Sequence, residues 1–279
     1  MDRWRERFAA VEARRSRGSL APLARVRTID ERTEGTRLRT IGSAWTRQAF
    51  DGPFYETPPD GAIAMGVVFV RSRQGDTATR NPALLGGGAV DEHLVYEGLS
   101  RVAADAVVAG AGTLHPDALF TVWRPELVEL RLALGLPRHP AQVVMSADGT
   151  VRPDELLLFN LPDVPVYVLT STAGRDRLAS SLSSRPWVHA LAGHSLREQF
   201  DSLRGAGVRR ACSVGGRRSA TALVDANLVK DVYLTTTQAS GGEPDTPWYI
   251  GRRRLEMQTV LVKEWDGEHG PVRFEHGVL

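Results

Sequence analysis

The sequence contains a single cysteine, Cys212, among 279 residues and only two lysines, Lys230 and Lys263. One thiol excludes an internal disulfide and a zinc site built from cysteines, and it fits a reducing compartment. No apolar run approaches the roughly 20 residues that a helix needs to span a bilayer. The opening residues 1–7 also lack the apolar stretch of a signal peptide. We therefore expect a cytoplasmic protein that does not enter a membrane.

Arginine supplies almost all of the basic charge, with 33 arginines and a formal net charge of only +2. This skew reflects genome composition better than selection for nucleic acid. Residues 1–40 hold eleven arginines and six acids, so the basic excess lies there. A basic arm can touch nucleic acid, but these acids are interleaved and aromatic residues are nearly absent. We favour a helix that faces solvent or packs on a partner, and we expect no nucleic-acid partner.

Apolar spacing divides the chain near Pro59. Residues 2–17 predict one amphipathic helix, with apolar residues at helical spacing at Trp4, Phe8 and Val11. The pattern is weak from there to Pro59, and Gly-Pro and Pro-Pro pairs indicate a loop. We predict an N-terminal extension over residues 1–59 and a second unit over residues 60–279. The first forty residues are expected to be an accessory helix and not part of a sheet.

The remaining chain alternates short apolar runs with segments of helical spacing. Residues 106–110, Ala-Val-Val-Ala-Gly, form a run too short for a typical helix, which predicts a strand buried on both faces. The other expected strands are residues 62–70, 141–147, 164–170, 187–191, 209–214 and 230–237, with a closing antiparallel pair at 255–265 and 272–278. Expected helices begin at Val90, Pro125, Ser195 and Ser219. The alternation predicts an α/β fold with a mixed, mostly parallel sheet flanked by helices.

Two glycines follow the central strand. Ligands of open α/β sheets lie just beyond the carboxyl ends of strands, and Gly110 and Gly112 let a ligand approach the backbone there. Asp117 and Arg124 occupy the irregular segment beyond, where side chains can turn back over the strand end. Arg101, on the last turn of the preceding helix, can point into the same space. The alternatives are a glycine turn without a ligand and an arginine that only complements the helix C-terminus.

A second glycine turn, Val214-Gly215-Gly216-Arg217-Arg218-Ser219, lies between an expected strand and a short helix. Free N–H groups at a helix start and nearby arginines attract an anion, so this turn is a candidate pyrophosphate cradle. It is neither the dinucleotide fingerprint nor a P-loop, and plain strand-to-helix turns have similar sequences. Ser171, with Arg175 nearby, could hold an adenosine ribose and its 2′-phosphate. A capped helix with a solvated basic face explains those residues equally well.

In combination these residues resemble the C-terminal reductase domain of the bifunctional riboflavin-biosynthesis deaminase–reductases. The matching positions are Asp105-Ala106, Gly110, Thr113, Asp117, Arg124, Gly215-Gly216, Leu228–Asp231, Gly241-Gly242 and Pro247. The resemblance covers roughly residues 62–279 and gives residues 1–59 no counterpart. It implies the dihydrofolate reductase fold. It also implies an NADPH-dependent reduction, in which hydride from the nicotinamide opens the ribose of a ribosylaminopyrimidine to a ribitylamine.

The resemblance further implies roles for individual residues. NADPH is expected to contact Val70, Gly110, Gly112, Thr113, Asp117, Ser171, Gly215, Gly216, Arg217, Arg218, Ser219, Ala220 and Thr221. A phosphorylated substrate is expected to contact Arg101 and Arg124, with Val214 and Gln74 in the same pocket. No catalytic residue and no metal ligand is implied.

Two departures from the family alter the substrate half. Gln74 replaces an acid in the turn after the first strong strand, and Val214 replaces a glutamate that contacts the substrate. These changes predict a pocket that is more positive and more apolar than the family's, which would prefer an anionic but less polar substrate. The lone cysteine also excludes the zinc site of the deaminase.

We therefore predict an NADPH-dependent reductase that forms a homodimer and acts on a small anionic molecule such as a pyrimidine or a pterin. One alternative retains the pyrimidine reductase activity itself, or a dihydrofolate reductase activity. Another is a non-catalytic nucleotide-binding paralogue whose basic arm recruits a partner.

Overall fold

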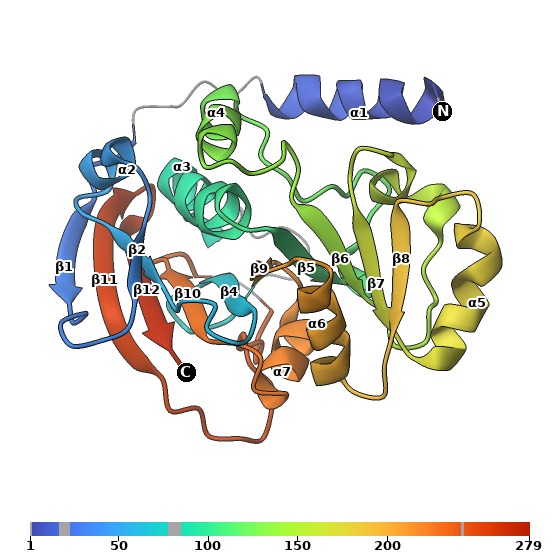
Figure 1. The fold of residues 1–279 in the computed structure, drawn as a ribbon. Helices are drawn as coiled ribbons and strands as arrows, with labels where there is room; N and C mark the ends of the chain where they lie inside the picture. Colours follow the sequence, from blue (N-terminus) through green and yellow to red (C-terminus); the bar gives the residue numbers. More distant parts are fainter. Residues whose placement is uncertain (1, 17–22, 78–84, 241–242) are drawn as a thin grey trace.

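The structure, a computed structural model, describes residues 2–16, 23–77, 85–240 and 243–279. Its parallel strands are β4 (Ala64–Arg71), β5 (Ala106–Gly110), β6 (Ala141–Met145), β7 (Val166–Thr170), β8 (Val188–Ala192), β9 (Arg210–Ser213) and β10 (Asp231–Thr236). Its antiparallel strands are β1 (Arg27–Glu31), β11 (Gln258–Gly267) and β12 (Gly270–Val278). Together they form one sheet in the order β1-β11-β12-β10-β4-β9-β5-β6-β7-β8 (Figure 1). The predicted mixed, mostly parallel sheet with a closing antiparallel pair is confirmed.

β5 is the central strand that the sequence predicted. All of its residues are buried, and it pairs in parallel with β9 on one side and β6 on the other. Side chains alternate along a strand, so its residues reach both faces of the sheet. Val108 joins a core cluster with Leu203 and Leu223 on one face. An uninterrupted apolar run is therefore what this position requires.

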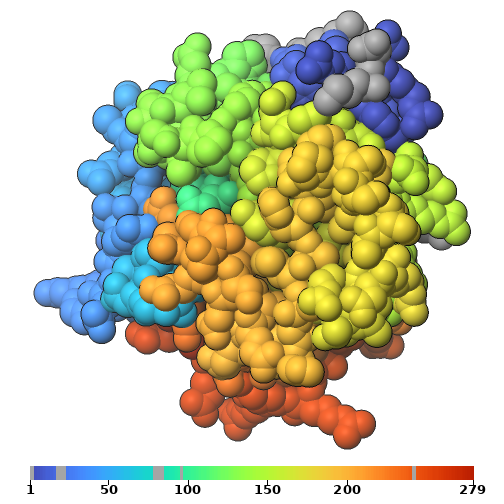
Figure 2. Space-filling view, turned by 45° about the vertical axis from the view of Figure 1, so that its right-hand side comes forward, coloured from blue at the N-terminus to red at the C-terminus, as the bar shows by residue number. Residues whose placement is uncertain are grey.

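Helices cover both faces of the sheet. α6 (Leu196–Gly205) and α7 (Arg217–Asp225) supply Leu203 and Leu223 to the cluster around Val108, and they are orange in the space-filling view (Figure 2). On the other face, α3 (Gly88–Asp91) runs directly into a π-helix, η2 (Glu92–Val102), whose Leu94 shares a cluster with Cys212. α4 (Pro125–Ala133) packs on η2, and α5 (Thr172–Leu182) packs on β7 and β8. A helix was predicted from Val90 to Val102, but its π-helical winding was not.

Short elements complete the described fold. They are α2 (Ala44–Ala49), β2 (Arg39–Ile41), β3 (Phe54–Glu56), η3 (Ala111–Thr113), η4 (Pro153–Glu155) and η5 (Leu157–Asn160). β2 and β3 form a separate two-stranded sheet. None of the described helices is long and apolar enough to span a membrane.

The expectation that the first forty residues contain no sheet element is wrong. The predicted helix is present as α1 (Asp2–Arg15), but β1 also pairs with β11 at one edge of the main sheet. The hydropathy pattern hides β1 because Ile29, its one strongly apolar residue, is 49% exposed and points to solvent. The inward-facing positions of β1 are Thr28 and Asp30, which carry no apolar signal.

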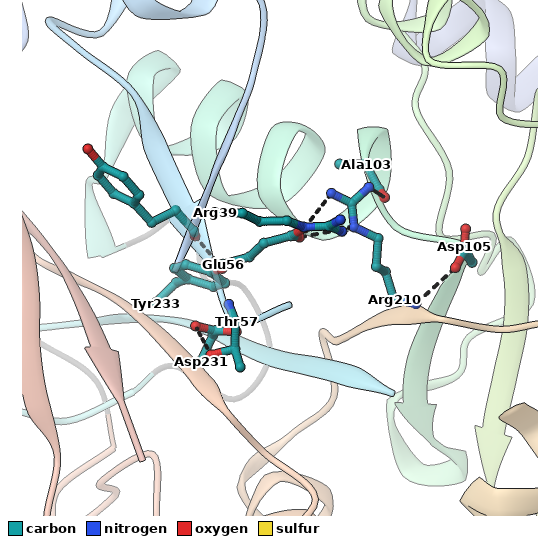
Figure 3. A network of polar contacts seen from close by, with 9 residues as sticks. Arg39, Glu56, Thr57, Ala103, Asp105, Arg210, Asp231 and Tyr233 are labelled. Carbon is teal, nitrogen blue, oxygen red and sulfur yellow. Dashed lines mark hydrogen bonds and ion pairs between the residues drawn. The ribbon is translucent and has the colours of Figure 1, made fainter. Parts of the chain in front are cut away.

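A polar network ties the N-terminal extension to the amino ends of the parallel strands (Figure 3). Glu56 accepts hydrogen bonds from Arg39 and from Arg210 at the start of β9. Thr57 donates its backbone N–H and its hydroxyl to the carboxylate of Asp231, at 3.0 and 3.1 Å. The extension therefore contacts the amino ends of the parallel strands, at the opposite end of the sheet from their carboxyl ends. The domain boundary near Pro59 stays a prediction.

Candidate functional site

The two glycine turns singled out in the sequence meet at the carboxyl ends of β5 and β9. A β-carbon at Gly110 would collide with the hydroxyl of Ser219, and one at Gly215 would lie 3.1 Å from the backbone nitrogen of Gly110. The N–H of Gly216 points to the hydroxyl of Thr113 at 3.4 Å. A side chain at Gly110 would force the hydroxyl of Ser219 to turn away, and one at Gly215 would crowd the backbone of Gly110. The structure thus brings together two motifs that are about a hundred residues apart in the chain.

α7 begins at this junction with Gly216 at its N-cap, and no side chain caps it. Uncapped N–H groups at a helix start favour an anion. Arg217 lies 3.9 Å from Glu243, and Arg218 and Thr221 border an open depression beside α7. Ala220 is fully buried, so its side chain packs beneath the helix. The junction can therefore hold a phosphate group, and positive charge is close by.

Three other residues predicted to contact the cofactor are Val70, Ser171 and Gly112. Val70 is buried on β4, where it pairs in register with Thr235. Ser171 caps α5, its hydroxyl accepting the N–H of Gly174 at 3.1 Å. It follows β7, which is two strands away from β5. Gly112 has open space around it.

Asp117 is engaged by the N-terminal helix. Arg7 donates to its carboxylate at 2.6 Å, and Arg14 does so at 3.4 Å. The hydrogen bond from Arg7 is the main reason that the pKa of Asp117 is lowered. Trp4 of the same helix is buried in a cluster with Leu119. The helix therefore covers the segment that follows β5.

Arg101 is buried, and it donates to the backbone oxygen of Thr121 at 3.2 Å. At the end of the same helix, Arg131 donates to the carbonyls of Arg101 and Ala104 at 2.7 Å each. Burial lowers the pKa of Arg131 to about 10. The fully buried Arg131 is thus the residue that satisfies the carboxyl end of η2.

Arg124 precedes α4 and lies against the first turn of η2. It donates to Glu92 at 3.1 Å and also contacts Nδ1 of His93. Burial, with a smaller contribution from the charge of Arg124, lowers the pKa of His93 to about 4. Since arginine can only donate, Nδ1 of the neutral ring accepts and the ring proton lies on Nε2. Glu92 and the half-buried Glu97 lie close to Arg124, so carboxylates accompany the guanidinium group here.

Val214 and Gln74, which were predicted to lie in the same pocket as Arg124, belong to two different turns. Val214 is half-buried, packs with the cluster beneath η2 and donates its N–H to Val108 at 3.0 Å. Gln74 is exposed in the turn after β4. The Gly241-Gly242 pair of the resemblance lies outside the described residues. The roles given to all of these residues stay predictions.

Sequence reasoning missed a set of buried polar groups on the η2 side of the sheet. Their side-chain atoms without a hydrogen-bond partner are Ser72 Oγ, Asp91 Oδ1, His93 Nε2, Glu97 Oε2 and Thr235 Oγ1. Burial raises the pKa of Asp91 to about 6, which Thr235 partly opposes. The sequence offered only a weak signal, an acid next to apolar Val90 on the inner face of a helix. Buried polar atoms are normally satisfied, so this set marks a candidate ligand site.

Comparison with known proteins identifies the fold. No protein-family model matches the chain, and no curated protein matches it. A solved pyrimidine reductase-like protein from Corynebacterium diphtheriae superimposes with a TM-score of 0.59 and 18% identity over 77% of this chain and 91% of that one. RibD from Acinetobacter baumannii gives 0.55 and 15%, over 79% of this chain and 59% of its own.

A third structure has the same fold. It is the diaminohydroxyphosphoribosylaminopyrimidine deaminase/5-amino-6-(5-phosphoribosylamino)uracil reductase from Thermotoga maritima, with a TM-score of 0.51 and 15% identity over 78% of this chain and 57% of its own. The chain spans little more than half the length of this protein and of RibD. At such identities the likeness shows the fold. The dihydrofolate-reductase-like fold that the resemblance implied is confirmed.

Proposed function

We propose that the protein is an NADPH-dependent reductase whose cofactor pyrophosphate lies at the start of α7. The contact between the two glycine turns carries this proposal, because the Thr113–Gly216 pair brings the exposed backbone of Gly112 and Gly216 to the carboxyl ends of β5 and β9. Ligands of open α/β sheets lie at such ends. NADPH supplies the hydride when bound. The protein binds and orients it and excludes water.

The substrate of this reductase would lie on the η2 side of the sheet. Arg124, His93 and Asp91 are there, and Val70 and Thr235 lie side by side on the neighbouring strands. The polar atoms without partners are concentrated on the same side. The groups that bind phosphate and those that bind the substrate would then lie on opposite faces of the sheet, at the carboxyl ends of its strands. The nicotinamide would lie between them.

The first prediction tests the glycine junction. Gly110→Ala should weaken NADPH binding at least about tenfold, because the new methyl group displaces the hydroxyl of Ser219, which must turn away at the junction proposed for the ligand. Fluorescence titration with NADPH and NADH measures this, and we expect the unmodified protein to prefer NADPH. Gly205→Ala is the matched control, because nothing lies within 4 Å of a β-carbon there.

A second change makes this test specific. Replacing Ser219 by Ala in the Gly110→Ala variant removes the atom that collides and should restore part of the affinity. Unchanged binding by Gly110→Ala in a folded protein would contradict the proposed cofactor position. Failure of the unmodified protein to bind either nucleotide would contradict the proposal as a whole.

One observation favours the non-catalytic alternative. Arg7 and Arg14 already occupy the carboxylate of Asp117, so a nucleotide would have to share or displace that contact. NADPH binding without oxidation of NADPH in the presence of pyrimidine or pterin substrates would support a nucleotide-binding paralogue. Turnover of the riboflavin precursor or of dihydrofolate would instead show that the original activity is retained. The homodimer and the cytoplasmic location remain part of the proposal, and light scattering that gives twice 30.5 kDa would support the dimer.

A further inference from the structure

The two arginines predicted to hold a phosphorylated substrate lie along one side of η2. Hydrogen bonds in a π-helix join residues five apart, so side chains four or five positions apart stack on the same side. His93, Glu97 and Arg101 have this spacing. Arg124, which lies directly before α4, contacts His93. Glu97 therefore lies between the two arginines. Both of them act on its charge.

Glu97 and its two neighbouring glutamates face two guanidinium groups. Arg101 and Arg124 favour its ionised form, whereas Glu92 and Glu126 oppose it. Arg124, with its side chain only 13% exposed, is already paired with Glu92. A phosphate that approached Arg124 would have to displace Glu92 and would face the charge of Glu97. Like charges at a partly buried site repel strongly, so this arrangement opposes an anionic group.

The same carboxylates have unused hydrogen-bond capacity. Oε2 of Glu97 and Oε1 of Glu126 are buried without a hydrogen-bond partner. Burial, its largest cause, raises the pKa of Glu97. A ligand that donates hydrogen bonds would satisfy these oxygens, whereas a phosphate would bring only further acceptors. Atoms of the teal segment that contains η2 are visible between the green and orange segments, so this part of the molecule is not fully covered (Figure 2).

We propose that the site around Glu97, along one side of η2 between Arg101 and Arg124, excludes phosphate. It selects a substrate that presents an amino, amidino or amide group to Glu97. The proposal rests on the proposed function only in taking the η2 side as the substrate side of the reductase. It replaces the anionic substrate expected from the sequence with one that is uncharged or cationic at this point. Glu97 and Glu92 are then the residues that determine specificity.

The test measures two small probes by calorimetry at neutral pH, without cofactor, so its result does not depend on whether NADPH binds. Inorganic phosphate should show no saturable binding to the unmodified protein at about 10 mM, whereas methylguanidinium, which pairs with a carboxylate through two hydrogen bonds, should bind. The Glu92→Gln/Glu97→Gln variant should bind phosphate at least about tenfold better and methylguanidinium at least about tenfold worse. Glu129→Gln is the matched control, because Glu129 is an exposed glutamate of α4.

Opposite responses of the two probes would support the proposal. Phosphate binding by the unmodified protein that disappears in Arg124→Ala would overturn it, because the arginines would then be available to an anion. So would a failure of methylguanidinium to bind, or a double variant that gains no phosphate affinity. Circular dichroism of each variant separates these outcomes from loss of the fold.

Discussion

Asp91 shows how a residue outside any recognisable motif can carry chemical meaning. It lies on the inner face of α3, is 5% exposed, and one of its oxygens has no hydrogen-bond partner. The glycines of the site could be predicted from the sequence because a strand followed by glycine has a distinct pattern. Asp91 could not, because a carboxylate near a helix start is usually a solvated favourable charge. Only the three-dimensional structure, in which Thr235 and Gly87 lie close to it, shows that it is a buried group.

The second prediction concerns Asp91, whose ionisation should make the stability of the protein depend on pH. The pKa of Asp91 in the folded protein, about 6, is above its usual value of 3.8, so folding favours the protonated form. Stability from this group is complete below pH 3.8 and is lost as the pH rises through 6. Asp91→Asn should therefore stabilise the protein at pH 8 by up to about 3 kcal/mol and have little effect near pH 4.

Urea denaturation at the two pH values measures this difference. Asp163→Asn, an exposed aspartate in the turn before β7, is the matched control. Equal stabilisation at both pH values would mean that Asp91 is not a strained buried acid. A large loss of NADPH oxidation in the same variant would add that its carboxyl group takes part in the reaction.

The strands that the sequence predicted are buried, whereas the strands that it missed are either exposed or very short. β5, β7 and β10 are fully or almost fully buried, so their apolar runs are continuous. β1 has no buried residue, and β2 and β3 have three residues each, which is too short for periodicity to be visible. The π-helical winding of η2 was also missed. Apolar spacing alone does not distinguish a π-helix from an α-helix.

Truncation at the N-terminus separates the contributions of α1 and β1. Val11 is 3% exposed and Trp4 is 9% exposed. Removing residues 1–16 therefore uncovers the apolar surface on which these two side chains pack. This should lower Tm by several degrees without unfolding the core. Removing residues 1–40 also exposes the backbone edge of β11, which should make the protein insoluble or prone to aggregation. Thermal unfolding and light scattering on the two truncated proteins measure this. A soluble protein lacking residues 1–40, with an unchanged Tm, would contradict the prediction and show that the fold does not need these residues.

At the scale of the whole molecule, the two ends of the parallel sheet have different chemistry. The carboxyl ends carry glycine turns, an uncapped helix start and buried polar atoms without partners. At the amino ends, Glu56 pairs with two arginines, and Asp231 accepts from Thr57 and lies 2.8 Å from His276. The first arrangement leaves groups for a ligand. The second pairs the carboxylates of Glu56 and Asp231 within the protein and holds the N-terminal extension in place.

This contrast predicts that stability and ligand binding can be changed separately. Glu56→Ala leaves Arg39 and Arg210 without their shared carboxylate. Breaking such a partly buried ion pair should cost about 3 kcal/mol and lower Tm by roughly 5–10 °C. NADPH affinity should stay within about twofold, because the change is at the opposite end of the strands from the glycine junction. Differential scanning fluorimetry and NADPH titration on the same preparation measure both quantities, with Gly110→Ala as the reciprocal variant. A tenfold loss of NADPH affinity in Glu56→Ala would mean that the amino-end network also shapes the ligand site, and that the two ends of the sheet are coupled.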